Sequence, residues 1–200
     1  MNAAWIATFF AVLLWSAIAP KDYLTWLLEV LPALIAFGVL LATRRRFPLT
    51  PLVSLLVLGH CIILMVGGHY TYAEVPLFDW LRDLVDGTRN DYDKLGHFAQ
   101  GFVPALVARE LTIRLRVFNG PHWRDFFIIC FCLAVSALYE LIEWWVALFN
   151  EQAAEAFLGT QGYVWDTQAD MATALLGAIA ALALLGRVHD RQLARLPAAT

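Results

Sequence analysis

The stretch TPLVSLLVLGHCIILMVGG, residues 50–68, decides the class of this protein. It contains no Asp, Glu, Lys or Arg. Because an α-helix rises about 1.5 Å per residue, a helix over this stretch is about 28 Å long. The hydrocarbon core of a bilayer is about 30 Å thick. Residues 50–68 are therefore predicted to form a transmembrane helix.

Five similar apolar segments lie on either side of this stretch. The chain is 60% hydrophobic and 16% charged, whereas ordinary soluble domains are about half apolar and about a quarter charged. We therefore predict an all-α fold, a polytopic transmembrane bundle of about six helices that forms a single integral membrane domain over residues 1–200. The expected spans are residues 3–19, 23–42, 50–68, 96–115, 126–149 and 170–186.

The distribution of basic residues predicts the orientation of these spans. Loops on the cytoplasmic side of a membrane carry an excess of Lys and Arg. If both termini are cytoplasmic, ten of the fourteen basic residues fall on that side, and only Lys21, Arg82, Arg89 and Lys94 fall on the other. Most acidic residues lie in the outer connections, where residues 76–85 also have the apolar spacing of an interfacial helix. We therefore expect both termini in the cytoplasm.

The net charge excludes one class of partner. It is −3, and the longest basic run is Arg44 to Arg46. A nucleic-acid-binding protein normally carries a basic patch or stripe, so nucleic acid is not expected as a partner. The expected surroundings are the lipid bilayer, with a small-molecule or lipid substrate whose identity the sequence leaves open.

The residues best suited to chemistry form three pairs, each spaced three or four positions apart. Residues at that spacing are neighbours on one face of a helix. With the predicted orientation, all three pairs fall in the outer half of the bilayer. The pairs are Asp93 with His97, Glu140 with Glu143, and Asp166 with Asp170.

So much negative charge inside a membrane needs neutralisation. Intramembrane carboxylates are costly and normally face the bundle interior with a partner. Lys94 is the nearest cation in sequence, so we expect shared protons or a bound divalent metal such as Zn, Mn, Mg or Fe. Candidate ligands are all six paired residues, with Glu140, Glu143 and His97 as candidate catalytic groups. Residues expected to support them are His69, Tyr70, Lys94, Gln100 and Ser136.

Simpler interpretations exist for several of these residues. Asp93 and Asp166 are also placed where helix N-caps occur. Glu29 is a single intramembrane acid that either pairs within the bundle or joins the site. His60 is expected to be a hydrogen-bonded packing residue, and His189 to be solvated.

Four strings carry a resemblance to a known family: GGHYTYAEVP (67–76), NDYDKLGHFAQGF (90–102), SALYELIEWW (136–145) and GTQGYVWDTQADM (159–171). Together they resemble the YjdF-like family of bacterial inner-membrane proteins. The resemblance implies a multi-pass protein of the bacterial inner membrane and assigns no reaction. A weaker similarity connects Asp93 to Phe98 and Asp170 to Gly177 with VanZ-like membrane proteins, although the downstream glutamine and arginine of that pattern have no counterpart here.

Three functions fit these observations. The first is a metal-dependent, membrane-embedded hydrolase of lipid or cell-envelope substrates, in which a bound ion lowers the pKa of a coordinated water. The second is an ion- or proton-coupled transporter that uses the same acids. The third is a non-catalytic membrane scaffold or sensor.

Overall fold

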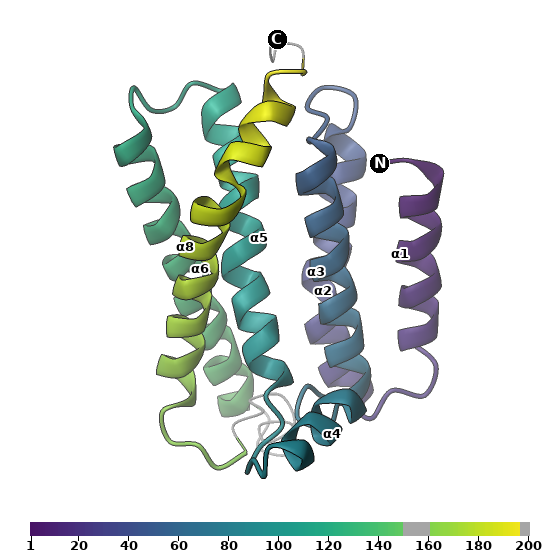
Figure 1. The fold of residues 1–200 in the computed structure, drawn as a ribbon. Coiled ribbons are helices and arrows are strands. Elements are labelled where there is room, and N and C mark those ends of the chain that lie inside the picture. Colours follow the sequence, from purple (N-terminus) through teal and green to yellow (C-terminus); the bar gives the residue numbers. More distant parts are fainter. Residues whose placement is uncertain (150–160, 197–200) are drawn as a thin grey trace.

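A computed structural model describes residues 1–149 and 161–196, and the regular structure in these residues is entirely α-helical. Figure 1 shows the longer helices side by side, with the short α4 across one end of the bundle. The helices are α1 (Ala3–Ser16), α2 (Tyr23–Thr43), α3 (Pro51–Tyr70), α4 (Pro76–Leu84), α5 (Tyr92–Arg114), α6 (Pro121–Phe149) and α8 (Asp166–Leu193).

The apolar character of the long helices fits a bilayer. Four of them, α2, α3, α6 and α8, are long and apolar enough to cross a membrane, and α1 is a shorter apolar helix. Large apolar side chains are exposed on their outer surfaces, for example Leu55 at 65% and Leu184 at 71%. The remaining long helix, α5, carries more polar side chains and packs against α3, α6 and α8. The predicted all-α transmembrane bundle is confirmed.

Polar residues fix where the first three helices begin. The side chains of Asn2, Asp22 and Thr50 accept hydrogen bonds from backbone N–H groups in the first turns of α1, α2 and α3. Such caps satisfy donors that have no partner inside the helix. The backbone hydrogen bond from Thr25 lowers the pKa of the Asp22 carboxyl below its ordinary value.

Helices α5 and α8 pack closely because two glycines face the contact. A Cβ atom on Gly101 would overlap the backbone of Ala174, and one on Gly177 would overlap the backbone of Phe98. Small residues allow this approach in many membrane helix pairs. The contact places the first turns of α8 beside those of α5, and so positions the acidic residues of both helices.

The start of α1 and the end of α8 lie at the same end of the bundle, while α4 lies at the other end (Figure 1). This arrangement agrees with an even number of crossings, although the side of the membrane on which each end lies stays a prediction. Helix α4 buries none of its side chains, and Leu77, Trp80 and Leu84 are all exposed. Its interfacial position likewise stays a prediction.

Candidate functional site

The three pairs of residues converge at the α4 end of the bundle. Asp93 and His97 lie in the first two turns of α5, Glu140 and Glu143 near the end of α6, and Asp170 at the start of α8. His97 is central, because its Nε2 lies 3.3 Å from Asp93 Oδ1 and 3.8 Å from Asp170 Oδ1. Its Nδ1 lies 3.8 Å from Glu140 Oε1. All five side chains are buried.

Two groups of atoms in this acidic cluster have the spacing of metal ligands. Asp93, His97 and Asp170 form one group, and His97, Glu140 and Glu143 form the other. Within each group the candidate ligand atoms lie within 4.8 Å of one another. Glu140 Oε1 and Asp93 Oδ2 are buried and have no hydrogen-bond partner among residues 1–149 and 161–196. Carboxylates and imidazole are ligands that suit a divalent metal, although Lys94 already donates to Asp170 and lies 3.6 Å from Asp93 Oδ2.

Asp166 and Asp170 already have cationic partners. Lys94 Nζ donates to Asp166 Oδ1 at 2.7 Å and to Asp170 Oδ1 at 2.6 Å. Arg89 Nη1 donates to the same Asp166 oxygen at 2.6 Å. The expectation that Lys94 is the nearest cation therefore missed Arg89, which lies in the loop before α5. Asp166 belongs to neither group of candidate ligands.

Arg89 remains charged in this setting. Partial burial by itself lowers the pKa of its guanidinium, but the hydrogen bond to Asp166 and the charges of Asp166, Asp93 and Asp91 raise that pKa above its ordinary value. The permanent charge makes Arg89 a fixed counter-ion for the acidic residues at the beginnings of α5 and α8.

The N-cap interpretation of Asp93 and Asp166 is wrong. Asp91 and Trp165 occupy the N-cap positions of α5 and α8, and neither makes a side-chain cap hydrogen bond. Asp93 and Asp166 lie inside the first turns, where the helix dipole favours negative charge. Their side chains turn to ion pairs instead, Asp93 with His97 and Asp166 with Lys94 and Arg89.

The expected supporting residues divide into two sets. Gln100 Oε1 lies 3.0 Å from His97 Nδ1, and the Oγ of Ser136 is buried with no hydrogen-bond partner in the described part of the chain. His69, in contrast, has its Nδ1 3.0 Å from the Ser16 carbonyl oxygen and its ring against Trp15. Tyr70 packs on His69. These two residues therefore lie at the α1–α3 contact and line no part of the cavity described next.

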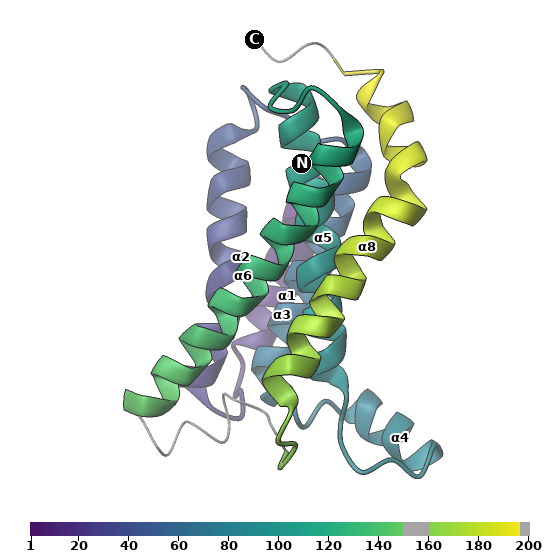
Figure 2. The ribbon, with the colours of Figure 1, turned by 90° about the vertical axis from the view of Figure 1, so that its left-hand side faces the viewer.

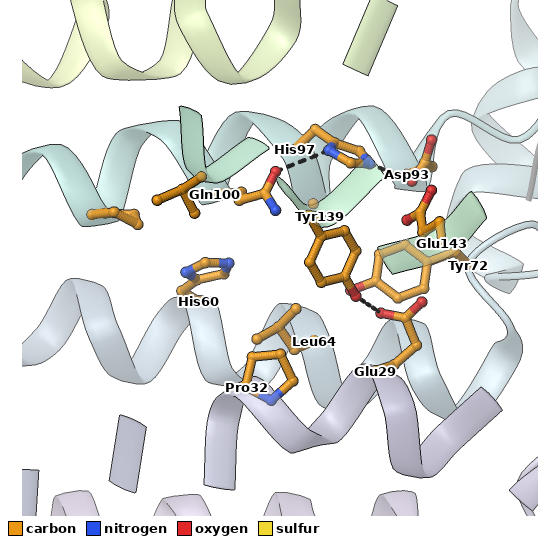
Figure 3. A pocket seen from close by; sticks show the side chains of 13 residues that line it. Glu29, Pro32, His60, Leu64, Tyr72, Asp93, His97, Gln100, Tyr139 and Glu143 are labelled. Carbon is orange, nitrogen blue, oxygen red and sulfur yellow. Dashed lines mark hydrogen bonds and ion pairs between the residues drawn. The ribbon is translucent and has the colours of Figure 1, made fainter. Parts of the chain in front are cut away.

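A cavity of about 220 Å³ opens beside the acidic cluster. In Figure 3, Glu29 lies across from His97 with the Tyr139 ring between them, and Tyr139 Oη donates to Glu29 Oε2 at 3.0 Å. Tyr72 also lines the cavity. Glu29 therefore pairs within the bundle, with Tyr139, and also lines the cavity. Sequence reasoning missed both tyrosines, although Tyr139 directly precedes Glu140.

His60 also lines this cavity. Among the described residues it has no side-chain hydrogen bond or ion pair, so the expectation of a hydrogen-bonded packing residue is wrong. A lone polar residue in an apolar span gives no sequence signal for which wall of a cavity it lines.

A helical bundle with apolar outer surfaces and a buried acid–histidine cluster beside a cavity defines a multi-pass membrane protein with an intramembrane ionisable site. The family model described as "Predicted membrane protein (DUF2238)" matches residues 1–191, and the chain belongs to this family. It is 54% identical over 184 residues to the inner membrane protein YjdF of Escherichia coli (strain K12). That match covers 92% of this chain and 88% of the relative.

No solved structure matches this chain. The resemblance to the YjdF-like family is confirmed, and with it a multi-pass protein of the inner membrane. The location of the termini and the roles of the individual site residues stay predictions.

Proposed function

We propose that this protein is a metal-dependent, membrane-embedded hydrolase that acts on a lipid or cell-envelope substrate. One observation carries the proposal: the ligand atoms of His97, Glu140 and Glu143 gather within 4.8 Å beside a buried cavity. Glu140 is only 8% exposed, yet its Oε1 has no hydrogen-bond partner in the described residues. A buried carboxylate oxygen without a partner is costly unless a cation or a proton satisfies it.

The geometry suggests how these residues would hold an ion such as Zn, Mn, Mg or Fe. His97 would use Nδ1, the nitrogen nearer Glu140, and its Nε2–H would point to Asp93. A carboxylate behind a ligating histidine fixes the tautomer and the direction of the ring. Gln100, which lies on Nδ1, must turn away from it. The bound ion would lower the pKa of a coordinated water.

The carboxylates differ in what they would do. Glu143 would complete the ligand group with His97 and Glu140, and because it also lines the cavity, its second oxygen would remain to take a proton from water there. Asp170 lies near Nε2 of His97 and also accepts from Lys94. It would extend the ligand set only if Lys94 moved. Asp166, tied to Lys94 and Arg89, would hold the first turns of α5 and α8 together.

A second candidate function is an ion- or proton-coupled transporter. Lys94 and Arg89 already balance two of the carboxylates, which reduces the need for a metal. Protons shared among the remaining acids would then satisfy Glu140. A scaffold or sensor role has no comparable support, because a purely structural cluster has little reason to adjoin a cavity.

We further propose that the end of the bundle with both termini faces the cytoplasm, which puts the acidic cluster in the outer half of the membrane. The excess of basic residues near that end supports this orientation. Reporter fusions after Arg46 and Arg116 should register the cytoplasm, and a fusion at Asp86 the opposite side. A reversed result would overturn the orientation.

Metal analysis of purified protein tests the proposed function. The wild-type protein should carry about one divalent ion per chain, and Glu140→Gln should lose most of it while keeping the fold. Glu74→Gln is a matched control, because Glu74 is an exposed acid paired with Lys21 away from the cluster. Chelator should lower the melting temperature of the wild type and the control, and should leave Glu140→Gln unchanged.

Two results would decide against the hydrolase. The first is protein that carries no ion and has a melting temperature that ignores chelator and added Zn, Mn or Mg. The second is proton flux into metal-free liposomes that is lost in Glu140→Gln, which would favour the transporter.

A further inference from the structure

The cavity beside the acidic cluster adjoins a second chamber. This apolar chamber has a volume of about 300 Å³ and is lined by residues of α2, α3, α5 and α6. The two spaces share four lining residues, which are Pro32, His60, Leu64 and Pro104. Each of the two prolines lies inside a helix, where a missing N–H leaves a gap in the hydrogen bonding of the backbone. The two spaces therefore adjoin each other at these four residues.

The two spaces, which together we call the site, differ in chemistry. The first cavity is lined by three carboxylates, Glu29, Asp93 and Glu143, and by the rings of Tyr72 and Tyr139. Apart from His60, the chamber lining consists of aliphatic and aromatic side chains, Pro and Cys61, with Phe131 and Leu111 at the far end. A molecule that fits both ends must have a polar head and a hydrocarbon tail.

The site has a route from the bilayer. Helices α2, α3, α5 and α6 follow one another as packed neighbours, whereas α2 and α6 make no extensive contact in the described residues. In Figure 2, α6 crosses over α2 in the lower half of the view, and the two helices separate toward the end that holds the termini. Phe131 is 51% exposed and Leu111 is 38% exposed, so the apolar chamber reaches the lipid-facing surface. A chain already dissolved in the bilayer can therefore enter sideways.

The charge of the polar end selects the kind of head. Only His60 and His97 among the lining residues can carry positive charge, against three carboxylates. Lys94 and Arg89 point to Asp166 and do not line the cavity. Glu29 lies apart from the proposed metal ligands, with two tyrosine rings close by. An acid flanked by aromatic rings is a favourable setting for an ammonium group.

The length of the site limits the tail to one chain. Along α5, the distance from His97 to Leu111 is about 21 Å at 1.5 Å per residue. Half of the hydrocarbon core of a bilayer is about 15 Å. The site is thus long enough for a head group and one hydrocarbon chain, where the chain has the length of one leaflet of the bilayer. Its volume is at the low end of the range of about 300 to 1,000 Å³ that holds drug-sized ligands.

We propose that the cavity and the apolar chamber together bind an amphiphile with an amine-bearing head and a single hydrocarbon chain. The ammonium group lies at Glu29, Tyr72 and Tyr139, and the chain runs past His60 and Leu64 toward Phe131. As a substrate assignment this rests on the proposed hydrolase, and it places an ester or amide bond that joins the amine-bearing head to the chain on the His97 side. Water added across that bond would release a carboxylic acid on one product and an alcohol or amine on the other. The binding itself does not depend on a metal.

Photocrosslinking in lipid nanodiscs tests the binding. The probe is dodecylamine with a diazirine at the end of its chain, applied to chelator-treated protein, and mass spectrometry maps the labelled residues. Label should appear in α2, α5 and α6 near the far end of the chamber. Unlabelled dodecylamine should compete at least ten times better than dodecanoate, which has the same chain and the opposite charge.

Matched variants separate the head from the tail. Glu29→Gln keeps an acceptor for Tyr139 and should weaken labelling at least tenfold, whereas the exposed acid variant Asp83→Asn should not. Ala108→Phe fills the chamber and should abolish labelling, with Ala36→Phe as a second blocking variant from α2. Ala183→Phe, on the exposed surface of α8, is the control for adding a phenyl ring.

Three results would overturn the proposal: dodecanoate competing as well as dodecylamine, label outside the chamber, or labelling of Ala108→Phe and Ala36→Phe at the level of the control. Because the protein is treated with chelator, the labelling result does not depend on whether the protein is a metal-dependent hydrolase. If the probe labels the chamber but the metal analysis described above finds no bound ion, the amphiphile site is retained and the hydrolase proposal is rejected.

Discussion

Helices α5 and α8 carry a buried polar cluster at each end, and the two clusters differ in how fully their hydrogen bonds are satisfied. At the end that holds the termini, Glu110 and His189 are fully buried. Glu110 accepts from the backbone N–H and hydroxyl of Thr50, from His189 and from Arg114. His189 Nδ1 also lies 3.1 Å from Arg109 Nη1. We call this set the terminal cluster.

The acidic cluster at the other end also contains acidic residues and a histidine, and it draws on α6 as well as on α5 and α8. Glu140, Asp93 and Ser136 each have a buried side-chain oxygen with no hydrogen-bond partner in the described residues, and a cavity adjoins them. In the terminal cluster, Arg114 Nε is the one such buried atom among the described residues. Well-satisfied buried networks make a structure rigid, whereas several unsatisfied buried oxygens beside a cavity require an explanation such as a ligand. This difference supports a structural role for the terminal cluster and the functional role proposed above for the acidic cluster.

The largest expected effect comes from breaking the terminal cluster. Glu110→Ala leaves His189, Arg114 and the Thr50 N–H without their acceptor, and removing one partner of a buried charge pair costs about 3 to 5 kcal/mol. Denaturant titration in detergent should show this loss, while metal content per folded chain stays unchanged. Glu110→Gln retains an acceptor and should lose less. A Glu110→Ala protein as stable as wild type would remove the contrast between the clusters.

A smaller effect is expected from Lys94→Gln in the acidic cluster. The change takes a cation from Asp166 and Asp170, and loss of charge-assisted hydrogen bonds of this kind costs about 1 to 3 kcal/mol. Arg89 still holds Asp166, which limits the loss. If the cluster binds a divalent metal, the variant should bind it more tightly than wild type. Weaker metal binding in Lys94→Gln would show that Lys94 helps to form the site.

The smallest effect belongs to a solvated polar group that lies in neither cluster. Asp22 caps α2, and losing a cap costs about 1 kcal/mol or less at an exposed position. The pKa of Asp22 is lowered on folding, so its contribution is complete above the unfolded value near 3.8 and is lost as pH falls through the folded value. Melting curves should separate Asp22→Ala from wild type at pH 7, and should bring them together near pH 2. A gap that persists there would exclude the carboxylate as its cause.

Much of the architecture could be predicted from the sequence, because apolar segments of bilayer length and the spacing of acid pairs are local signals. The pairing of His97 with Glu140 follows from helices that run in known directions. The spans are less sharply defined than the helices, since α6 and α8 extend past the apolar segments 126–149 and 170–186. Hydropathy marks where lipid begins, and a helix can continue beyond that point.

The errors concern partners that lie far apart in sequence. His189 was expected to be solvated, but it is buried against Glu110. Arg89 pairs with Asp166 across 77 positions, and Tyr139 with Glu29 across 110. No periodicity within one helix reports which neighbour packs beside it. The expectation that His69 supports the site was wrong for the same reason. A position near the end of α3 does not indicate which neighbouring helix the ring faces.

If the acidic cluster binds a metal as proposed, the close contact of α5 with α8 at Gly101 and Gly177 affects which ion it can hold. Backbone against backbone leaves these two helices no room to approach further, so the spacing of His97 and Asp170 is set by the chain itself. Glu140 and Glu143 come from α6. In Figure 2, α6 slants away from α8 toward the α4 end of the bundle, where the acidic cluster lies. A change in the tilt of α6 would therefore adjust the distance between the ligands to the radius of the ion. A small ion would draw that helix inward, and a large one would leave it where it is.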